Sequence, residues 1–152
     1  MSKGFPKNNF SKKELDNLKI TFVVSKFNQN VVGKLLDSTE ARLLELSVNK
    51  KNISRIYVPG AFEIPFAVKK SIDEYDQDAI ICLGAIIRGE TSHYELISNN
   101  VFSSLTHLNI SEKIPIINGI LTTENINQAE KRIENGKYYA ETCIEMINLY
   151  SK

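Results

Sequence analysis

Residues 79–94 read Ala-Ile-Ile-Cys-Leu-Gly-Ala-Ile-Ile-Arg-Gly-Glu-Thr-Ser-His-Tyr, a predicted strand at 79–83 that leads through a glycine-containing loop into a predicted helix. Loop amides and a helix N-terminus carry partial positive charge, and glycine lets a ligand approach the backbone. A histidine at this place, His93, can move protons near neutral pH. The stretch therefore predicts a phosphate site with His93 beside it. The loop alone is a weak signal, because it is neither a Walker motif nor a dinucleotide fingerprint.

The rest of the chain repeats the same alternation of a short apolar strand and a helix. Further strands are predicted at residues 18–24, 53–58 and 115–121. Helical spacing of apolar side chains predicts helices at 29–48, 64–75, 92–108, from about 125 and at 137–149. Nearly continuous apolar strands between helices indicate a parallel sheet covered on both faces. We therefore expect an α/β fold in three layers, α/β/α, around a four-stranded parallel sheet.

Length and composition limit the class of protein. With 152 residues, 42% of them hydrophobic and 24% charged, the chain is expected to form one domain. A net charge of +1 gives no reason to expect a nucleic acid or an anionic membrane as a partner. No apolar run reaches the length of a membrane span and no signal-peptide pattern opens the sequence, so we expect a cytoplasmic location. Cys82 and Cys143 lie in apolar contexts without metal-ligand spacing and are expected to be buried free thiols.

The segment before the first strand, residues 1–17, is polar, and Phe5 and Phe10 are its candidate anchors. Two interpretations are open: a disordered tail, or an arm that packs on a neighbouring subunit and covers the two phenylalanines. The expected organisation is therefore an arm at 1–17 followed by a domain at 18–152.

Polar and glycine-rich motifs follow the predicted strands, and parallel α/β folds bind ligands at that edge of the sheet. The four motifs are Phe27-Asn28, Gly60–Glu63, Gly84–His93 and Asn118–Thr123. Aromatic rings suit stacking on a flat heterocycle, and a carboxylate such as Glu63 accepts hydrogen bonds from sugar-like hydroxyls. Together with the glycine loop and His93, these motifs predict a site for a phosphate and a flat ring, with a group for proton transfer.

Each of these residues also has a simpler interpretation. Phe27 and Phe62 could be core residues, and Glu63 could be an acidic residue that favours the N-terminal end of a helix dipole. His93 could be a polar surface or capping residue. Arg88 is equally compatible with an ion pair that braces the loop and with a ligand contact. The functional interpretation depends on compatible chemistry at four independent strand ends.

Longer motifs carry a resemblance to a known family. They are Val58–Pro65, Leu83–Tyr94 and Asn118–Thr123, together with Phe27-Asn28. From about residue 18 to the C-terminus, the chain resembles 6,7-dimethyl-8-ribityllumazine synthase, an enzyme of riboflavin biosynthesis. The resemblance implies a flavodoxin-like fold, a transferase activity, and no cofactor or metal.

The reaction implied by the resemblance is the penultimate step of riboflavin biosynthesis. It condenses 5-amino-6-(D-ribitylamino)uracil with 3,4-dihydroxy-2-butanone 4-phosphate to give 6,7-dimethyl-8-ribityllumazine, phosphate and water. The implied partners are these small molecules and further copies of the chain. We expect a homo-oligomer, a pentamer at least, with each site between adjacent subunits.

The resemblance also implies roles for individual residues. His93 is the expected proton shuttle, and Phe27 is expected to stack on the pyrimidine. The remaining expected contacts are Ala61, Phe62 and Glu63 for the pyrimidine and ribityl chain, Ile87 beside the ring, and Gly89, Glu90 and Thr91 for the phosphate. Arg132 matches the family arginine that binds phosphate from a neighbouring subunit, and Asn118 is expected to come from that neighbour too.

The chain departs from the family pattern in two places. Asn118 stands where many members carry an aromatic residue, so pyrimidine binding is expected to depend more on Phe27 and on the backbone at Asn118. The segment between Arg132 and Gly136 is a few residues shorter than in the family. Lys137 lies close to the family lysine of that segment but does not align with it cleanly.

Two other functions fit parts of the pattern. A non-catalytic flavin- or lumazine-binding protein would keep the aromatic residues and the loop but would need neither His93 nor Arg132. A flavodoxin-like electron carrier would need a hydroxyl-rich phosphate loop after the first strand, where this chain has Ser25-Lys26-Phe27-Asn28. The presence of both His93 and Arg132 favours the enzyme.

Overall fold

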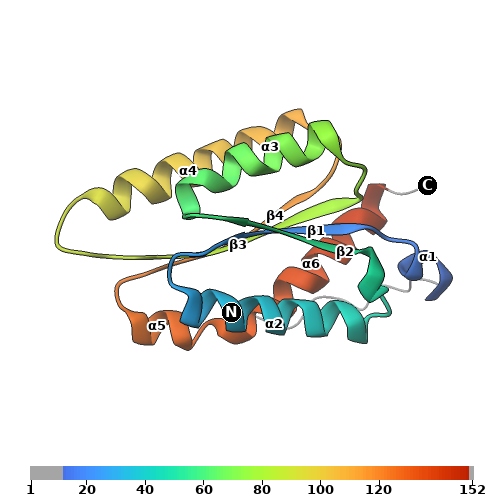
Figure 1. Cartoon of the computed structure of the whole chain (residues 1–152), viewed down its shortest axis with the longest axis horizontal. Coiled ribbons are helices and arrows are strands. Elements are labelled where there is room, and N and C mark those ends of the chain that lie inside the picture. The colour runs from blue at the N-terminus through green and yellow to red at the C-terminus, as the bar shows by residue number, and fades with distance from the viewer. Residues whose placement is uncertain (1–11, 151–152) are drawn as a thin grey trace.

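The computed structural model describes residues 12–150, which form a sheet with helices on both faces (Figure 1). The strands are β1 (Ile20–Ser25), β2 (Ile53–Val58), β3 (Ala79–Ile87) and β4 (Ile116–Thr123). All are parallel and lie in the order β2-β1-β3-β4. The predicted three-layer α/β/α fold with a four-stranded parallel sheet is confirmed, and flavodoxin-like sheets begin with this strand order.

Helices fill the two outer layers. One face of the sheet is covered by α3 (Ile64–Glu74) and α4 (His93–Ser111), and the other by α2 (Gln29–Glu45), α5 (Ile126–Glu130) and α6 (Gly136–Tyr150) (Figure 1). Shorter pieces are α1 (Lys12–Asp16) and the 3₁₀ turns η1 (Lys50–Asn52), η2 (Ala61–Glu63) and η3 (Ile133–Asn135). None of the helices within residues 12–150 has the length and apolar character needed to cross a membrane.

The central strands are buried on both faces because they are apolar at nearly every position. Every residue of β1 is buried, and so is β3 up to Ile86. Side chains alternate along a strand, so Phe22 and Leu83 pack in the layer of α2 and α6, whereas Val23 and Cys82 pack against α3 and α4. Continuous apolar strands are what a parallel sheet between two helical layers requires.

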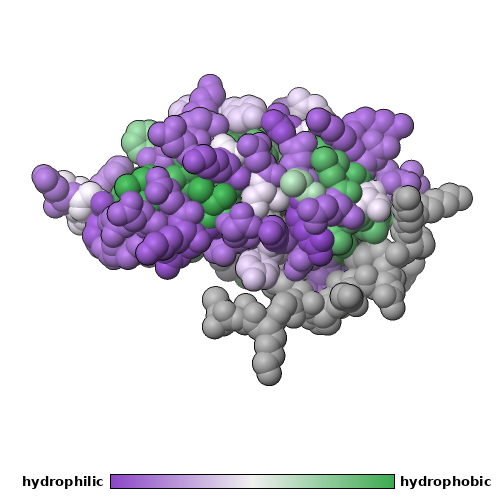
Figure 2. All heavy atoms as spheres, turned by 90° about the horizontal axis from the view of Figure 1, so that it is seen from below, coloured by the Kyte–Doolittle hydropathy of each residue, from purple (hydrophilic) through white to green (hydrophobic). Residues whose placement is uncertain are grey.

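The helices turn their polar sides outward. The face formed by α2, α5 and α6 is mostly hydrophilic, with smaller hydrophobic areas between the polar side chains (Figure 2). Leu44, Ile126 and Tyr138 are among the exposed large hydrophobic residues on these helices. Cys82 and Cys143 are buried free cysteines, as the sequence predicted.

The third strand is longer than predicted. It was expected to end at Leu83, but it continues to Ile87, which pairs with Thr123 of β4. Gly84 therefore belongs to the strand, and a Cβ there would lie only 3.0 Å from the Ser25 Oγ. Because β1 ends three residues earlier in the register, the ends of β3 and β4 extend about 10 Å beyond it.

The break between the last helices also differs from the prediction. The last helix was expected to begin at residue 137, but Gly136 is already the first residue of α6, and the helix that starts near residue 125 ends at Glu130. A Cβ at Gly136 would lie 2.7 Å from the Thr39 Oγ1 and 2.8 Å from the Thr39 backbone nitrogen. The glycine is needed for close packing of α6 on α2 rather than for a turn.

Two further predictions, on the buried face of α4 and on the segment before the first strand, differ from the structure. Helical spacing in residues 92–108 predicts that Leu96 shares an inner face with Val101 and Leu105, but Leu96 is 59% exposed, whereas Val101 and Leu105 are buried. Residues 12–16, counted with the arm, form α1, and Leu15 packs into the core layer of α2 and α6. The proposed anchors Phe5 and Phe10 lie outside the described residues.

Candidate active site

The loops after β1 and β2 meet the end of β3 at the carboxyl edge of the sheet. The Phe27 amide donates a hydrogen bond to the Pro59 carbonyl over 3.2 Å. The Asn28 side-chain amide donates to the Ala85 carbonyl over 2.9 Å. These contacts bring three of the four predicted motifs together at the switch point between β1 and β3, where flavodoxin-like folds bind ligands.

Asn28 shapes the turn from β1 into α2. Its backbone has φ 60° and ψ 42°, the left-handed conformation that asparagine tolerates better than most residues. Its side chain does not cap α2 and bonds to β3 instead. The residue therefore sets the position of the adjacent Phe27.

Two aromatic side chains stand out from this edge. Phe27 is 70% exposed and Phe62 is 62% exposed, so the interpretation of both as core residues is wrong for this chain. Phe62 lies in η2 between Ala61, which is half-buried, and Glu63, which is exposed. Exposed rings beside a carboxylate are available to a flat ligand that also carries hydroxyl groups.

Glu63 is placed by the turn that starts α3. Its side chain makes no capping hydrogen bond to α3. A structural role for Glu63 is therefore limited to a favourable interaction of its charge with the helix dipole. A Cβ at Gly60 would lie 3.4 Å from its Oε2 atom, so the carboxylate is close to the glycine backbone. The carboxylate is thus available as a hydrogen-bond acceptor.

The loop after β3 presents the predicted phosphate residues. Ile87 is half-buried at the strand end, and Gly89, Glu90, Thr91 and His93 are exposed. A Cβ at Gly89 would meet nothing within 4 Å, so protein packing does not demand glycine there. The His93 amide donates to the Thr91 Oγ1 over 3.2 Å, and His93 is the first residue of the 19-residue α4. The loop and the imidazole therefore lie at the positive end of a long helix dipole.

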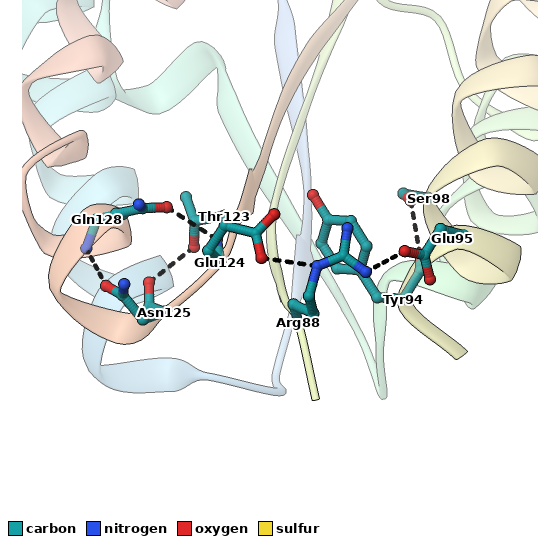
Figure 3. A network of polar contacts seen from close by, with 8 residues as sticks. All are labelled: Arg88, Tyr94, Glu95, Ser98, Thr123, Glu124, Asn125 and Gln128. Carbon is teal, nitrogen blue, oxygen red and sulfur yellow. Dashed lines mark hydrogen bonds and ion pairs between the residues drawn. The ribbon is translucent and has the colours of Figure 1, made fainter. Parts of the chain in front are cut away.

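Arg88 acts as the brace of this loop. Its Nε donates to the Glu124 Oε2 over 2.7 Å, its NH1 pairs with the Glu95 carboxylate, and its Cζ lies 4.4 Å from the centre of the Tyr94 ring (Figure 3). The hydrogen bond from Arg88 holds the pKa of Glu95 below its ordinary value. Of the two interpretations open for Arg88, the structure supports the ion pair.

Arg132 and Asn118 are placed differently from the strand-end residues. Arg132 follows α5 and is exposed, and its NH1 donates to the Gln128 carbonyl over 2.8 Å. Asn118 was expected at a strand end, but it lies within the edge strand β4, opposite Cys82 and five residues before Thr123. That separation is about 16 Å along a strand, so within one chain Asn118 is remote from the loops.

A separate hollow lies away from these residues. It has a volume of about 830 Å³ and runs between β2 and α3, where Ser54, Phe66, Lys70 and Tyr75 are among its lining residues. None of the predicted site residues lines it. Within residues 12–150 there is no group of three or more His, Cys, Asp and Glu side chains that could hold a metal ion. The candidate site of a single chain is instead a set of mostly exposed residues on the sheet edge.

The partners of Arg88 were missed at the sequence level. Tyr94 and Glu95 directly follow His93, and Glu124 follows the fourth strand, but only the pairing of β3 with β4 brings Glu124 beside Arg88. The signal that could have identified Glu124 is that both strands end at the same level of the sheet. Ile87 pairs with Thr123, and the residues that follow this pair are Arg88 and Glu124.

A comparison with known families agrees with this geometry. The model of the 6,7-dimethyl-8-ribityllumazine synthase family matches residues 17–151, nearly the whole chain. The match includes both the exposed aromatic pair and the braced loop with His93. The chain therefore belongs to the 6,7-dimethyl-8-ribityllumazine synthase family of transferases in riboflavin biosynthesis.

Proposed function

We propose that the chain condenses 5-amino-6-(D-ribitylamino)uracil with 3,4-dihydroxy-2-butanone 4-phosphate to 6,7-dimethyl-8-ribityllumazine. The observation that carries this proposal is the family match over residues 17–151. Exposed Phe27 and Phe62 beside Glu63, and His93 at the N-terminus of α4, support it.

The substrates divide between two parts of the edge. Phe27 stacks on the pyrimidine ring, and Glu63 accepts hydrogen bonds from the ribityl hydroxyls. The pyrimidine ring also lies against Ala61, Phe62 and Ile87. The phosphate lies against the backbone of Gly89, Glu90 and Thr91 at the helix N-terminus, whose dipole offsets part of its charge.

The chemistry joins two molecules and releases one phosphate and two waters. The 5-amino group attacks the ketone carbon, and loss of water gives an imine. Phosphate then leaves with cleavage of its C–O bond, and the enol that forms becomes a ketone. The ribityl-bearing nitrogen attacks this ketone carbon, and loss of a second water closes the second ring. His93 carries protons between these groups, which typically contributes about 10²–10⁴-fold in rate. Holding both substrates in a reactive geometry contributes more, up to about 7–11 kcal/mol of the barrier.

The site is shared between copies of the chain. Arg132 and Asn118 of the partner subunit complete the edge that carries Phe27 and Glu63. The exposed position of Asn118 on edge strand β4, about 16 Å from its own strand end, supports a neighbour as the recipient. The assembly is a homo-oligomer, a pentamer at least, and the location is cytoplasmic.

A purified sample with both substrates tests the proposal. The lumazine product is expected to appear by absorbance and fluorescence, and omission of either substrate is the control. No product over background, together with tight binding of added lumazine, would identify a binding protein instead. Light scattering on the same sample measures the size of the assembly.

A further inference from the structure

We propose that Arg88 is a positioning residue that bridges the start of α4 to the start of α5, and so holds in place both His93, which serves the site of its own chain, and Arg132, which serves the site of the adjacent subunit. The inference rests on the proposed function for the roles of His93 and Arg132. The bridge crosses the ends of β3 and β4, with the guanidinium between two carboxylates (Figure 3).

On the α4 side, Arg88 contacts the two residues that follow His93. Its guanidinium lies over the ring of Tyr94 and pairs with the Oε1 of Glu95. The other carboxylate oxygen of Glu95, Oε2, is buried and has no hydrogen-bond partner within residues 12–150. Glu95 therefore depends on Arg88, and the first turn of α4, which orients the exposed His93 ring, depends on both.

On the α5 side, the contacts continue from Glu124 to Arg132. The Glu124 backbone amide donates to the Gln128 Oε1 over 2.8 Å. The Gln128 backbone amide donates to the Asn125 Oδ1 over 2.9 Å, and the Gln128 backbone carbonyl accepts from the Arg132 NH1 over 2.8 Å. A continuous series of polar contacts thus joins the histidine helix to the arginine segment.

Arg88 suits this task better than direct phosphate binding. Its charge is shared by two carboxylates, so the cluster of Arg88, Glu95 and Glu124 carries a formal charge of −1 and does not attract an anion. A guanidinium has a rigid fork of donors that can serve two acceptors, whereas a lysine provides a single point of charge. Both ion pairs are partly exposed, so they are expected to add little to stability.

The first test removes the brace and observes His93 directly. In protein labelled with ¹³C in its histidine rings, Arg88→Gln is expected to shift or broaden the His93 resonance and to leave His107, farther along α4, unchanged. Arg42→Gln is the matched control, because Arg42 also joins two carboxylates, those of Glu45 and Glu141, away from the site. An unchanged His93 resonance, or the same change in the control, would overturn the proposal.

The second test separates the two arms of the bridge by kinetics. Arg88→Gln is expected to lower kcat at least tenfold with little change in the unfolding temperature, and Arg88→Lys to recover only part of it. Glu95→Gln is expected to lower kcat mainly, and Glu124→Gln to raise the KM for the butanone phosphate mainly. Adding Glu95→Gln to Arg88→Gln is expected to cost little more, since the two act as a unit.

The two tests distinguish failure of the inference from failure of the proposed function. If the unsubstituted protein forms no lumazine, the histidine resonances still decide whether Arg88 positions His93. If the protein is active and Arg88→Gln keeps full kcat and both KM values, the positioning role is wrong. If Arg88→Gln does not fold, Arg88→Lys takes its place in both measurements.

Discussion

The two halves of the carboxyl edge are built in different ways. The ring half, residues 27 and 60–63, presents exposed Phe27 and Phe62 on short backbone turns. The charged half, residues 88–95 with Glu124, holds its main cation between two carboxylates and over an aromatic ring. The difference indicates that substitutions in the ring half change binding of the pyrimidine alone, whereas those in the charged half change the rate of reaction, through Glu95 and His93, or the binding of the phosphate, through Glu124.

The largest expected effect is that of His93→Ala. Loss of the proton shuttle is expected to lower kcat about 10²–10⁴-fold while measurable activity survives, because substrate positioning does not depend on the imidazole. His107→Ala, which removes an exposed histidine of the same helix, is the matched control. Full activity of the His93 variant at saturating substrate would rule out the shuttle.

Arg132→Ala is expected to have the next largest effect. A charge-assisted hydrogen bond contributes about 1.5–3 kcal/mol, so the KM for the butanone phosphate is expected to rise about 10- to 100-fold. The KM for the pyrimidine is expected to stay nearly constant. Steady-state kinetics with each substrate varied in turn measures both, and equal rises would contradict the phosphate role.

Phe27→Ala tests the ring half. Stacking on a base contributes about 1–3 kcal/mol, so the KM for the pyrimidine is expected to rise about tenfold with little change in kcat. Phe66→Ala is the control, because Phe66 is also 70% exposed but lies on α3 and lines the separate hollow. A fall in kcat for the Phe27 variant would show that the two halves are not independent.

The smallest expected effect concerns acid stability. Because Arg88 lowers the pKa of Glu95 in the folded chain, this pair stabilises the fold above the ordinary glutamate pKa of about 4.3 and loses its contribution as the pH falls through the lowered value. Urea unfolding at pH 5 and pH 3 is expected to show a slightly smaller acid loss for Glu95→Gln. A larger acid loss in that variant would reverse the assigned sign.

Much of this architecture follows from the sequence by simple rules. Apolar strands alternating with amphipathic helices predicted the parallel sheet, and the rule that ligands bind at strand ends selected Phe27, Phe62, Glu63 and the loop with His93. Those residues do lie on one edge. Whether they bind the substrates named above stays a prediction until the substitutions are made.

What could not be predicted depends on distances between elements. Gly84 was assigned to the loop after the third strand and Gly136 to the break before the last helix, but both belong to regular elements in which an added Cβ would crowd a neighbouring element. The partner Glu124 was missed because it meets Arg88 only through the register of β3 with β4. Leu96 was assigned to a buried face by spacing alone, whereas α4 leaves it uncovered.

The two cysteines have a practical consequence for future work. Both Cys82 and Cys143 are buried, and burial raises the pKa of each thiol, so neither presents a thiolate to a reagent in the folded chain. They are the only cysteines in the sequence. A cysteine introduced at exposed Leu96, one turn from His93, would therefore carry a fluorophore or spin label at a single place, without prior removal of the native thiols.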